Sequence, residues 1–416
     1  MRVAILLLLA IMPFAFADKS DHWAVIVAGS NGFWNYRHQA DVCHAYQIMK
    51  KNGIPDDQII VLSYDDVASS SQNPFPGKLF NQPNGKDVYA GCQIDYSGSQ
   101  VTPSTFLGVI KGTLSNGKVL KSNSKSKVFI NFADHGAPGL IAFPRGELYA
   151  KDFHEALLYM NQNNMYEEMT IYIEACESGS MFDNILESDL NIYATTAANP
   201  HESSWGYYCS PDDVVDGKHI GSCLGDLYSI AWMEDTDANN VCSESLDTQF
   251  TTVKTRTTKS HVMKYGDMSF TSEVVGNFQG TCDSKATLSS FLRNLNKKTS
   301  DREYASINSR DAKMDYLYNK YMRTNSAEDA KELSDEIAHR KSIDGRFEYL
   351  RSVIGIQMED KPVVQDFECY KSLVEAYKFQ CGRLDEYDLN FLGNFVSMCN
   401  AKVEPTKMLG AIRNMC

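Results

Sequence analysis

Short apolar segments that alternate with helix-like stretches constrain the fold of this chain more than any other feature. They lie at residues 22–28, 59–62, 127–132, 169–173 and 191–196. Each is a nearly continuous apolar run, as expected of strands buried on both faces. The stretch 38–51 has the pattern of a helix, and helical stretches separate the later runs. The alternation predicts an α/β fold with a mostly parallel sheet and helices on both faces, which binds ligands at the carboxyl ends of its strands.

The first residues have the pattern of a signal peptide. Arg2 precedes the apolar run 3–12, and Ala15, Phe16 and Ala17 provide a small-residue site for cleavage after Ala17. A membrane anchor is the alternative, but the run is shorter than the roughly 20 residues that span a bilayer. No later segment resembles a membrane span. Passage through the secretory pathway permits disulfides, and the odd count of 11 cysteines leaves at least one thiol unpaired.

Length, charge and the C-terminal pattern narrow the possibilities further. A chain of 416 residues is long enough for two folded units. Its net charge of −13 repels phosphate backbones and anionic lipids, so nucleic acid is not expected as a partner. From about residue 312 the pattern becomes helical, as at 326–339 and 347–356. This part ends with four cysteines that could pair in three ways, namely Cys369, Cys381, Cys399 and Cys416.

Reactive side chains follow two of the predicted strands. Asp134, His135 and Gly136 come after one, and Cys176 comes after the other. Taken singly, a buried Cys or a His after a strand is more often structural. Together, at one edge of a parallel sheet, they suit a cysteine hydrolase, because an imidazole lowers the pKa of a thiol that is otherwise mostly protonated. The backbone N–H groups of Gly136 and Cys176 would then stabilise the developing oxyanion.

Several motifs resemble the legumains, the asparaginyl endopeptidases also called vacuolar processing enzymes. The resemblance is carried by residues 28–32 (AGSNG), 35–41 (NYRHQAD), 134–136 (DHG), 174–180 (EACESGS), 194–200 (ATTAANP), 225–229 (GDLYS) and 232–235 (WMED). It reaches the C-terminal cysteines, so it includes nearly the whole chain. It implies a caspase-like catalytic domain, and the EACESG stretch is similar to the caspase nucleophile signature.

The resemblance also implies roles for individual residues. Asn35 would orient the ring of His135, although a loop-stabilising role fits Asn35 as well. Asp134 would be able to form the succinimide linked to peptide ligation, and a plain structural role is the alternative. The asparagine specificity pocket would consist of Arg37, His38, Glu174, Ser203 and Asp226.

Such a pocket would suit a carboxamide, which needs both donors and acceptors. A substrate Asp would meet the pocket carboxylates and be accepted only when acid protonates it, and Gln would be one methylene too long. The alternative reading of the same charges is a structural ion-pair cluster.

The C-terminal region is similar to the legumain prodomain, which covers the active site of the zymogen. The implied division is a signal peptide at 1–17, a catalytic domain at 18–303, an activation segment at 304–325 and a helical prodomain at 326–416. Self-cleavage at acidic pH would occur after Asn325, with Asn308 as the other candidate. The implied disulfides join Cys369 to Cys399 and Cys381 to Cys416. A generic helical domain with its own ligand is the alternative for this region.

The other cysteines and the partners complete the expectation. A disulfide is expected between Cys209 and Cys223, a further pair is suggested for Cys242 and Cys282, and both Cys43 and Cys92 are expected to stay reduced. Expected partners are proteins with exposed Asn, the chain's own prodomain and cystatin-type inhibitors.

The compartment is a vacuole, a lysosome or the outside of the cell, and the chain has no N-glycosylation sequon. No cofactor and no metal are expected, because no cluster has ligand spacing. Rival readings are a peptide ligase that uses the same acyl-enzyme, a glycolipid-anchor transamidase and an inactive decoy.

Overall fold

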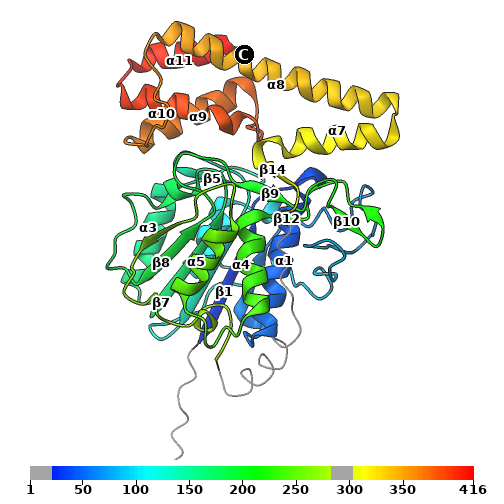
Figure 1. Cartoon of the computed structure of the whole chain (residues 1–416). Coiled ribbons are helices and arrows are strands. Elements are labelled where there is room, and N and C mark those ends of the chain that lie inside the picture. The colour runs from blue at the N-terminus through cyan, green and yellow to red at the C-terminus, as the bar shows by residue number, and fades with distance from the viewer. Residues whose placement is uncertain (1–20, 283–302) are drawn as a thin grey trace, which may run out of the picture.

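The structure is a computed structural model that describes residues 21–282 and 303–416. The predicted signal peptide and its cleavage site lie outside the described residues. The described chain forms an α/β unit at one end and a layer of helices above it (Figure 1). Within the described ranges, no helix is both long and apolar enough to cross a membrane.

A six-stranded sheet organises the α/β unit, with the order β13-β8-β7-β3-β1-β2. Five strands run parallel, and β13 pairs antiparallel with β8 at one edge. The strands are β1 (His22–Ala28), β2 (Ile59–Leu62), β3 (Lys127–Ala133), β7 (Glu168–Glu174), β8 (Ile192–Thr196) and β13 (Met263–Gly266). The mostly parallel sheet predicted from the apolar runs is thus confirmed.

Helices cover both faces of the sheet, which explains why the strand sequences are continuously apolar. Every residue of β1 is buried, with Ala24 and Ile26 in one apolar cluster and Val25 and Val27 in another. The first cluster includes α1 (Tyr36–Lys51), α4 (Leu227–Ala238) and α5 (Leu246–Arg256). The second includes α2 (Pro103–Ile110) and α3 (Ala150–Gln162).

Smaller sheets surround the carboxyl edge of the main sheet. One contains β4 (Gly136–Ala137), β5 (Leu140–Ala142) and β6 (Glu147–Tyr149). Another contains β9 (Trp205–Tyr207), β12 (Gly225–Asp226) and β14 (Ser306–Asn308). A hairpin of β10 (Val214–Val215) and β11 (Lys218–His219) lies apart. The strand β14 comes from the segment that joins the two units, so this segment is tied to the catalytic unit by strand pairing.

The C-terminal unit is helical, as predicted, and lies over the carboxyl ends of the strands (Figure 1). It contains α7 (Ala312–Thr324), α8 (Ala327–Ile354), α9 (Phe367–Cys381), α10 (Gly393–Asn400) and α11 (Pro405–Met415). The two stretches predicted at 326–339 and 347–356 are one continuous helix, α8. Ser326 caps its first turn and Gly355, with φ 68°, ends it.

Five disulfides are present, and all 11 cysteines lie in the described ranges. The structure joins Cys369 to Cys399 and Cys381 to Cys416, the pairing that the resemblance implied. It also joins Cys209 to Cys223 and Cys242 to Cys282.

The expectation that Cys43 and Cys92 stay reduced is wrong, because they form a disulfide with a Cα–Cα distance of 5.5 Å. Cys43 lies on α1, and the long loop at 64–98 folds back against that helix. Contact between residues 49 positions apart is not visible in local sequence patterns.

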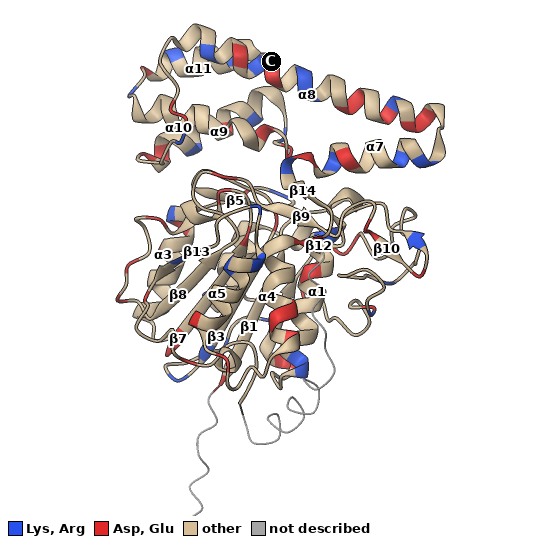
Figure 2. Ribbon diagram, in the orientation of Figure 1, with Lys and Arg blue, Asp and Glu red and all other residues tan. Residues whose placement is uncertain are grey.

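Charged side chains lie mainly on the helices and loops, while the strands of the sheet carry few of them (Figure 2). Both signs alternate along α7 and α8, as expected of helices with solvated faces.

Candidate active site

Two adjacent parallel strands bring His135 and Cys176 to the same edge of the sheet. Ala133 at the end of β3 pairs with Glu174 at the end of β7, so both loops start at the same level. The loops are also in contact, because a Cβ on Gly136 would lie 2.4 Å from the carbonyl oxygen of Cys176. Only glycine fits this position. Cys176 is fully buried, and His135 is 2% exposed.

Asn35 holds the ring of His135 from the opposite side of the cleft. It ends the short 3₁₀ helix η1 (Phe33–Asn35), directly before α1. Its Oδ1 lies 3.0 Å from Nε2 of His135. Among the described residues, Nδ1 of His135 has no hydrogen-bond partner. The second ring nitrogen is thus left for chemistry.

The thiol of Cys176 is held by Ser204, a residue that the sequence analysis did not identify. The backbone N–H of Ser204 donates to Sγ at 3.3 Å, and its Oγ lies 3.6 Å from Sγ. Burial raises the pKa of Cys176, while the nearby charge of Arg310 and the contacts with Ser204 oppose the rise. Burial also disfavours the charged form of His135, which lowers the pKa of that residue. Burial under the helical layer therefore opposes the charged form of both groups, while the nearby Glu386 carboxylate favours protonation of His135.

A buried polar pocket lies beside these groups. Nε of Arg37 donates to Oδ1 of Asp226 at 2.8 Å, and both side chains are buried. Oε2 of Glu174 accepts from the backbone N–H and the hydroxyl of Ser229 at 2.9 and 3.0 Å. Within the described part of the chain, Arg37 Nη2, Glu174 Oε1, Asp226 Oδ2 and His38 Nε2 lack hydrogen-bond partners, and the last two of these atoms lie 3.4 Å apart.

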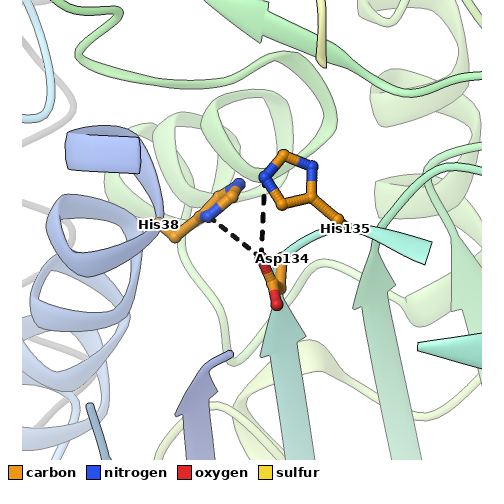
Figure 3. A group of neighbouring side chains, drawn as sticks. All are labelled: His38, Asp134 and His135. Atoms are coloured by element: carbon orange, nitrogen blue, oxygen red, sulfur yellow. Dashed lines mark ion pairs between the residues drawn. The ribbon is translucent and has the colours of Figure 1, made fainter. Parts of the chain in front are cut away.

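His38, Asp134 and His135 form a compact group at the floor of the cleft (Figure 3). Oδ1 of Asp134 lies 3.4 Å from Nδ1 of His38 and 3.9 Å from Nε2 of His135. Residue types of this kind can bind a metal ion, and local sequence spacing gave no sign that they meet. However, Nδ1 of His38 contacts Oγ of Ser30 at 2.6 Å, and Nε2 of His135 contacts Asn35. These hydrogen bonds give both nitrogens a role that needs no metal.

The connecting segment passes directly over the candidate nucleophile. Its strand β14 pairs antiparallel with β9, and the backbone N–H of Ser309 donates to the carbonyl of Ser204 at 3.1 Å. Oγ of Ser309 lies 3.1 Å from Oγ of Ser204. Ser309 is thus linked to Cys176 through Ser204, whose Oγ contacts both side chains. An extended strand added to a sheet edge is also the way in which many peptides bind.

Arg310 fixes this segment in place. Its guanidinium donates to Oε2 of Glu177 at 2.8 Å and also to the carbonyl oxygen of Gly136. Its own carbonyl accepts from Arg340 of α8 at 3.0 Å. Arg310 is 4% exposed, so these contacts are largely shielded from water.

Glu386 of the helical unit reaches the candidate catalytic groups. Its carboxylate accepts from Nε1 of Trp34 at 2.8 Å and from Nδ2 of Asn35, and it lies 3.5 Å from Nε2 of His135. Although burial opposes ionisation, these partners hold the pKa of Glu386 at about 2. A cavity of about 300 Å³ remains beside it, lined by residues of both units that include Gly29, Asp134 and Arg383.

The structure brings together most residues that the sequence analysis named. Asn35, Arg37, His38, Asp134, His135, Gly136, Glu174, Cys176 and Asp226 surround one cleft, and the partly buried Ser203 adjoins Ser204. Asn325 lies elsewhere, at the turn between α7 and α8. Sequence reasoning missed Ser204, Arg310 and Glu386. Only Arg310 gave a signal, as a cation directly after the Asn308–Ser309 candidate bond.

Hydrolysis of peptides by a cysteine is the chemistry that suits a thiol and an imidazole brought together in this way under a covering segment. The chain is a cysteine endopeptidase and belongs to the peptidase C13 family. The model described as "Peptidase C13 family" matches residues 22–281, and the one described as "Legumain, prodomain" matches residues 331–416.

Relatives extend over nearly the whole chain. The vacuolar-processing enzyme delta-isozyme of Arabidopsis thaliana is 41% identical and covers 96% of this chain and 91% of its own length. Legumain of Canavalia ensiformis is 38% identical, and the match covers 96% of this chain and 89% of that protein. A solved structure, caspase-1 of Spodoptera frugiperda, has a TM-score of 0.40 and 11% identity, and covers 68% of this chain and 99% of its own.

Proposed function

We propose that this chain is the zymogen of an endopeptidase that hydrolyses peptide bonds after asparagine. The observation that carries the proposal is the set of unpartnered atoms in the buried pocket. Within the described ranges, Arg37 contributes one unpaired donor, and Glu174 and Asp226 contribute one unpaired acceptor each. A carboxamide has an acceptor oxygen and a two-hydrogen donor, so it complements all three atoms. Leaving such buried groups unpaired is costly, which favours a ligand that pairs them.

The same pocket argues against other side chains. A substrate aspartate would place a second negative charge beside Glu174 and Asp226 until acid protonates it. Glutamine would push its amide one methylene too far. The hydroxyl of Ser309 contacts Ser204, and in the described structure the three pocket atoms have no hydrogen-bond partner. We therefore expect cleavage after Asn across a broad pH range and after Asp only in acid.

The proposed mechanism uses residues at the edge of the sheet. His135 takes the proton of Cys176, and the thiolate attacks the carbonyl carbon of the scissile bond. Asn35 holds Nε2 of the ring, so the proton travels on Nδ1. The N–H groups of Gly136 and Cys176 stabilise the oxyanion, and His135 then protonates the leaving amine. Water attacks the acyl-enzyme and restores the thiol.

The helical unit and its connecting segment are proposed to keep the enzyme latent in two ways. The segment that includes β14 fills the path of a substrate strand, and burial opposes formation of the Cys176 thiolate. The proposed division is a catalytic domain at 18–303, an activation segment at 304–325 and a prodomain at 326–416. Self-cleavage after Asn325 in acid would release the prodomain.

Glu386 supplies the proposed acid trigger. Its pKa in the covered state is about 2, below its ordinary value of 4.5. A depressed carboxyl pKa contributes stability above the ordinary value and loses it as the pH falls from about 4.5 towards 2. Glu177 acts in the opposite direction, because burial raises its pKa to about 7 and its protonation favours the covered state. Release therefore requires a pH near or below the ordinary pKa of Glu386, because the carboxyl is then protonated once the prodomain has moved away.

Location and the fate of Asp134 are also part of the proposal. Names of the relatives, such as vacuolar-processing enzyme, support a vacuolar or related secretory compartment. Burial raises the pKa of Asp134 well above its usual range, and its carboxyl accepts the backbone N–H of His135. This is the nitrogen that a succinimide requires, so we propose Asp134 as the candidate for that modification.

The decisive experiment compares matched peptides with Asn, Gln or Asp at the cleaved position. Acid-processed enzyme is assayed between pH 4 and 7, with products identified by mass spectrometry. Cleavage after Asn at least about tenfold faster than after Gln is expected, since one methylene is worth about 1–3 kcal/mol. Equal rates for the two peptides would contradict the proposal. An added amine nucleophile in the same assay measures the ligase alternative, because it intercepts the same acyl-enzyme.

A further inference from the structure

A buried carboxyl lies directly beneath the proposed asparagine pocket. Asp41 is on α1, one turn after Arg37, and is 1% exposed. Its Oδ2 accepts the backbone N–H of Asp226 at 3.1 Å. Its Oδ1 accepts from Nδ2 of Asn81 at 2.7 Å. Both oxygens of Asp41 therefore face N–H donors.

The hydrogen bond between Asp41 and the backbone of Asp226 is important because it helps to hold Asp226 in place. Asp226 stands at the N-cap of α4, where an aspartate usually accepts a hydrogen bond from the first turn of the helix. Within the described structure its side chain makes no such cap bond and turns instead to Arg37. Its backbone is held by pairing with Gly206 on one side and by Asp41 on the other. The position of the Asp226 carboxylate thus depends on Asp41.

A hydrogen-bonded chain supports Asp41 from the protein surface. Asn81, from the long loop at 64–98, also donates to the carbonyl of Leu224 at 2.9 Å. Oδ1 of Asn81 lies 2.7 Å from Nδ1 of His44, whose Nε2 lies 3.0 Å from Asp237. Asn81 is itself 1% exposed. The long loop therefore contributes a buried amide to the support of the pocket.

The groups around Asp41 disfavour its charged form. Asp226 from β12, Glu174 from β7 and the neutral Asn81 act on its carboxyl. Arg37, His38 and His44 lie about one turn away on α1, and burial lowers the pKa of His38. Burial and the neighbouring Asp226 raise the pKa of Asp41 well above its usual range. Asp41 therefore acts on the pocket through its hydrogen bonds, while the carboxylate that it positions, Asp226, is the one that disfavours a substrate aspartate.

We propose that Asp41 is a positioning and specificity-determining residue of the asparagine pocket, because it fixes the backbone of Asp226 and thereby the Asp226 carboxylate that faces the substrate carboxamide. The inference rests on the proposed function. It predicts that Asp41 affects which side chain is accepted, rather than the reactivity of Cys176.

The test uses acid-processed enzyme with the Asp41→Asn substitution. An amide at this position must turn its NH₂ towards either Asn81 or Asp226, both of which donate, so one buried donor loses its acceptor. The kcat/KM for Asn peptides is expected to fall about tenfold or more, mainly through KM. The Asn-over-Asp preference at neutral pH is expected to fall as well. Alkylation of Cys176 by iodoacetamide, which does not use the pocket, is expected to change by less than about twofold.

Two further variants keep the inference testable if Asp41→Asn folds poorly. Asn81→Ser removes one donor to Asp41 and is expected to change the preference in the same direction by a smaller factor. Asp235→Asn is the matched control, because Asp235 is also a buried carboxyl, 4% exposed. It lies on α4 nine residues after Asp226, which is about 13 Å from the pocket by helical rise. It should keep the wild-type preference.

Unchanged KM and preference in both the Asp41 and the Asn81 variants would overturn the inference. Failure of the wild type to prefer Asn would instead overturn the proposed function, so the two failures are distinguishable.

Discussion

Two asparagine–serine bonds near the junction of the two units lie in opposite environments. Asn308 ends strand β14, which is already extended against β9 within reach of Cys176. Asn325 lies at the exposed tip of the α7–α8 hairpin in a left-handed conformation with φ 48°. Asn308 thus has the extended conformation that a bound substrate would adopt, whereas Asn325 is exposed to solvent.

The contacts of each site show what prevents its cleavage. At the first, Arg310 pairs with Glu177, and Ser309, one residue beyond Asn308, is held by Ser204, which contacts the candidate nucleophile. At the second, Oγ of Ser326 accepts the backbone N–H of Asp329 and its hydroxyl donates to the carboxylate of Asp329, which also pairs with Lys320 at 2.8 Å. The tip must unwind before it can enter the cleft as a strand. If the enzyme processes itself as proposed, register would protect the near bond, and helical structure would protect the distant one.

The largest expected effect comes from removing the nucleophile. In Cys176→Ala, neither bond should be cut, and self-processing should fall by about 10⁴-fold or more. The measurement is the intact mass of purified zymogen during incubation in acid. A trace of active wild-type enzyme serves as the control and should cut the variant after Asn325. Loss of the prodomain at the wild-type rate without that addition would exclude self-cleavage.

The comparison is tested most directly by lengthening each asparagine by one methylene. Asn325→Gln should slow release of the prodomain about a hundredfold, while Asn308→Gln should change it less than twofold. Gln tolerates the left-handed conformation poorly and would loosen the tip, so slower cutting there cannot reflect a more stable hairpin. Product masses after timed acidification provide the measurement. The reverse order of effects would show that register does not protect Asn308.

Glu386→Gln should produce a smaller change with a clear pH signature. An amide keeps the shape but loses the charge that pairs with His135. The wild type loses the stabilisation that this charge gives to the covered state only below about pH 4.5, whereas the variant lacks it at every pH. Release near pH 6 should then be about tenfold faster, with a flatter profile between pH 6 and 4. Glu368→Gln is the matched control, because Glu368 forms an exposed pair with Lys151. A profile identical to the wild type would rule out Glu386 as the trigger.

The smallest effect is expected at the rim of the contact between the units. Lys371 lies 3.1 Å from Asp152, and both side chains are well exposed. Such pairs contribute little, so Lys371→Ala should change the release rate by less than about twofold. A large acceleration would mean that the rim, rather than Arg310 and Glu386, holds the prodomain in place.

Much of the site could be predicted because its residues lie in local patterns. His135 and Cys176 each follow an apolar run, and neighbouring parallel strands end at a common edge, so their meeting follows from the alternation of elements. Arg37, Glu174 and Asp226 came from the family resemblance. The Cys43–Cys92 disulfide, Ser204 and Glu386 could not be predicted, because each depends on a contact between segments far apart in the chain.

The sequence by itself determined the class of fold, the candidate thiol and imidazole, and a helical C-terminal unit, since periodicity and residue type encode these locally. Only the tertiary structure decided which polar atoms of the described residues lack partners, that Ser309 is held by Ser204 beside the candidate nucleophile, and that a carboxylate from the prodomain lies 3.5 Å from the imidazole. Register and burial arise from packing between distant segments, and they set both the pairing of polar groups and their pKa values.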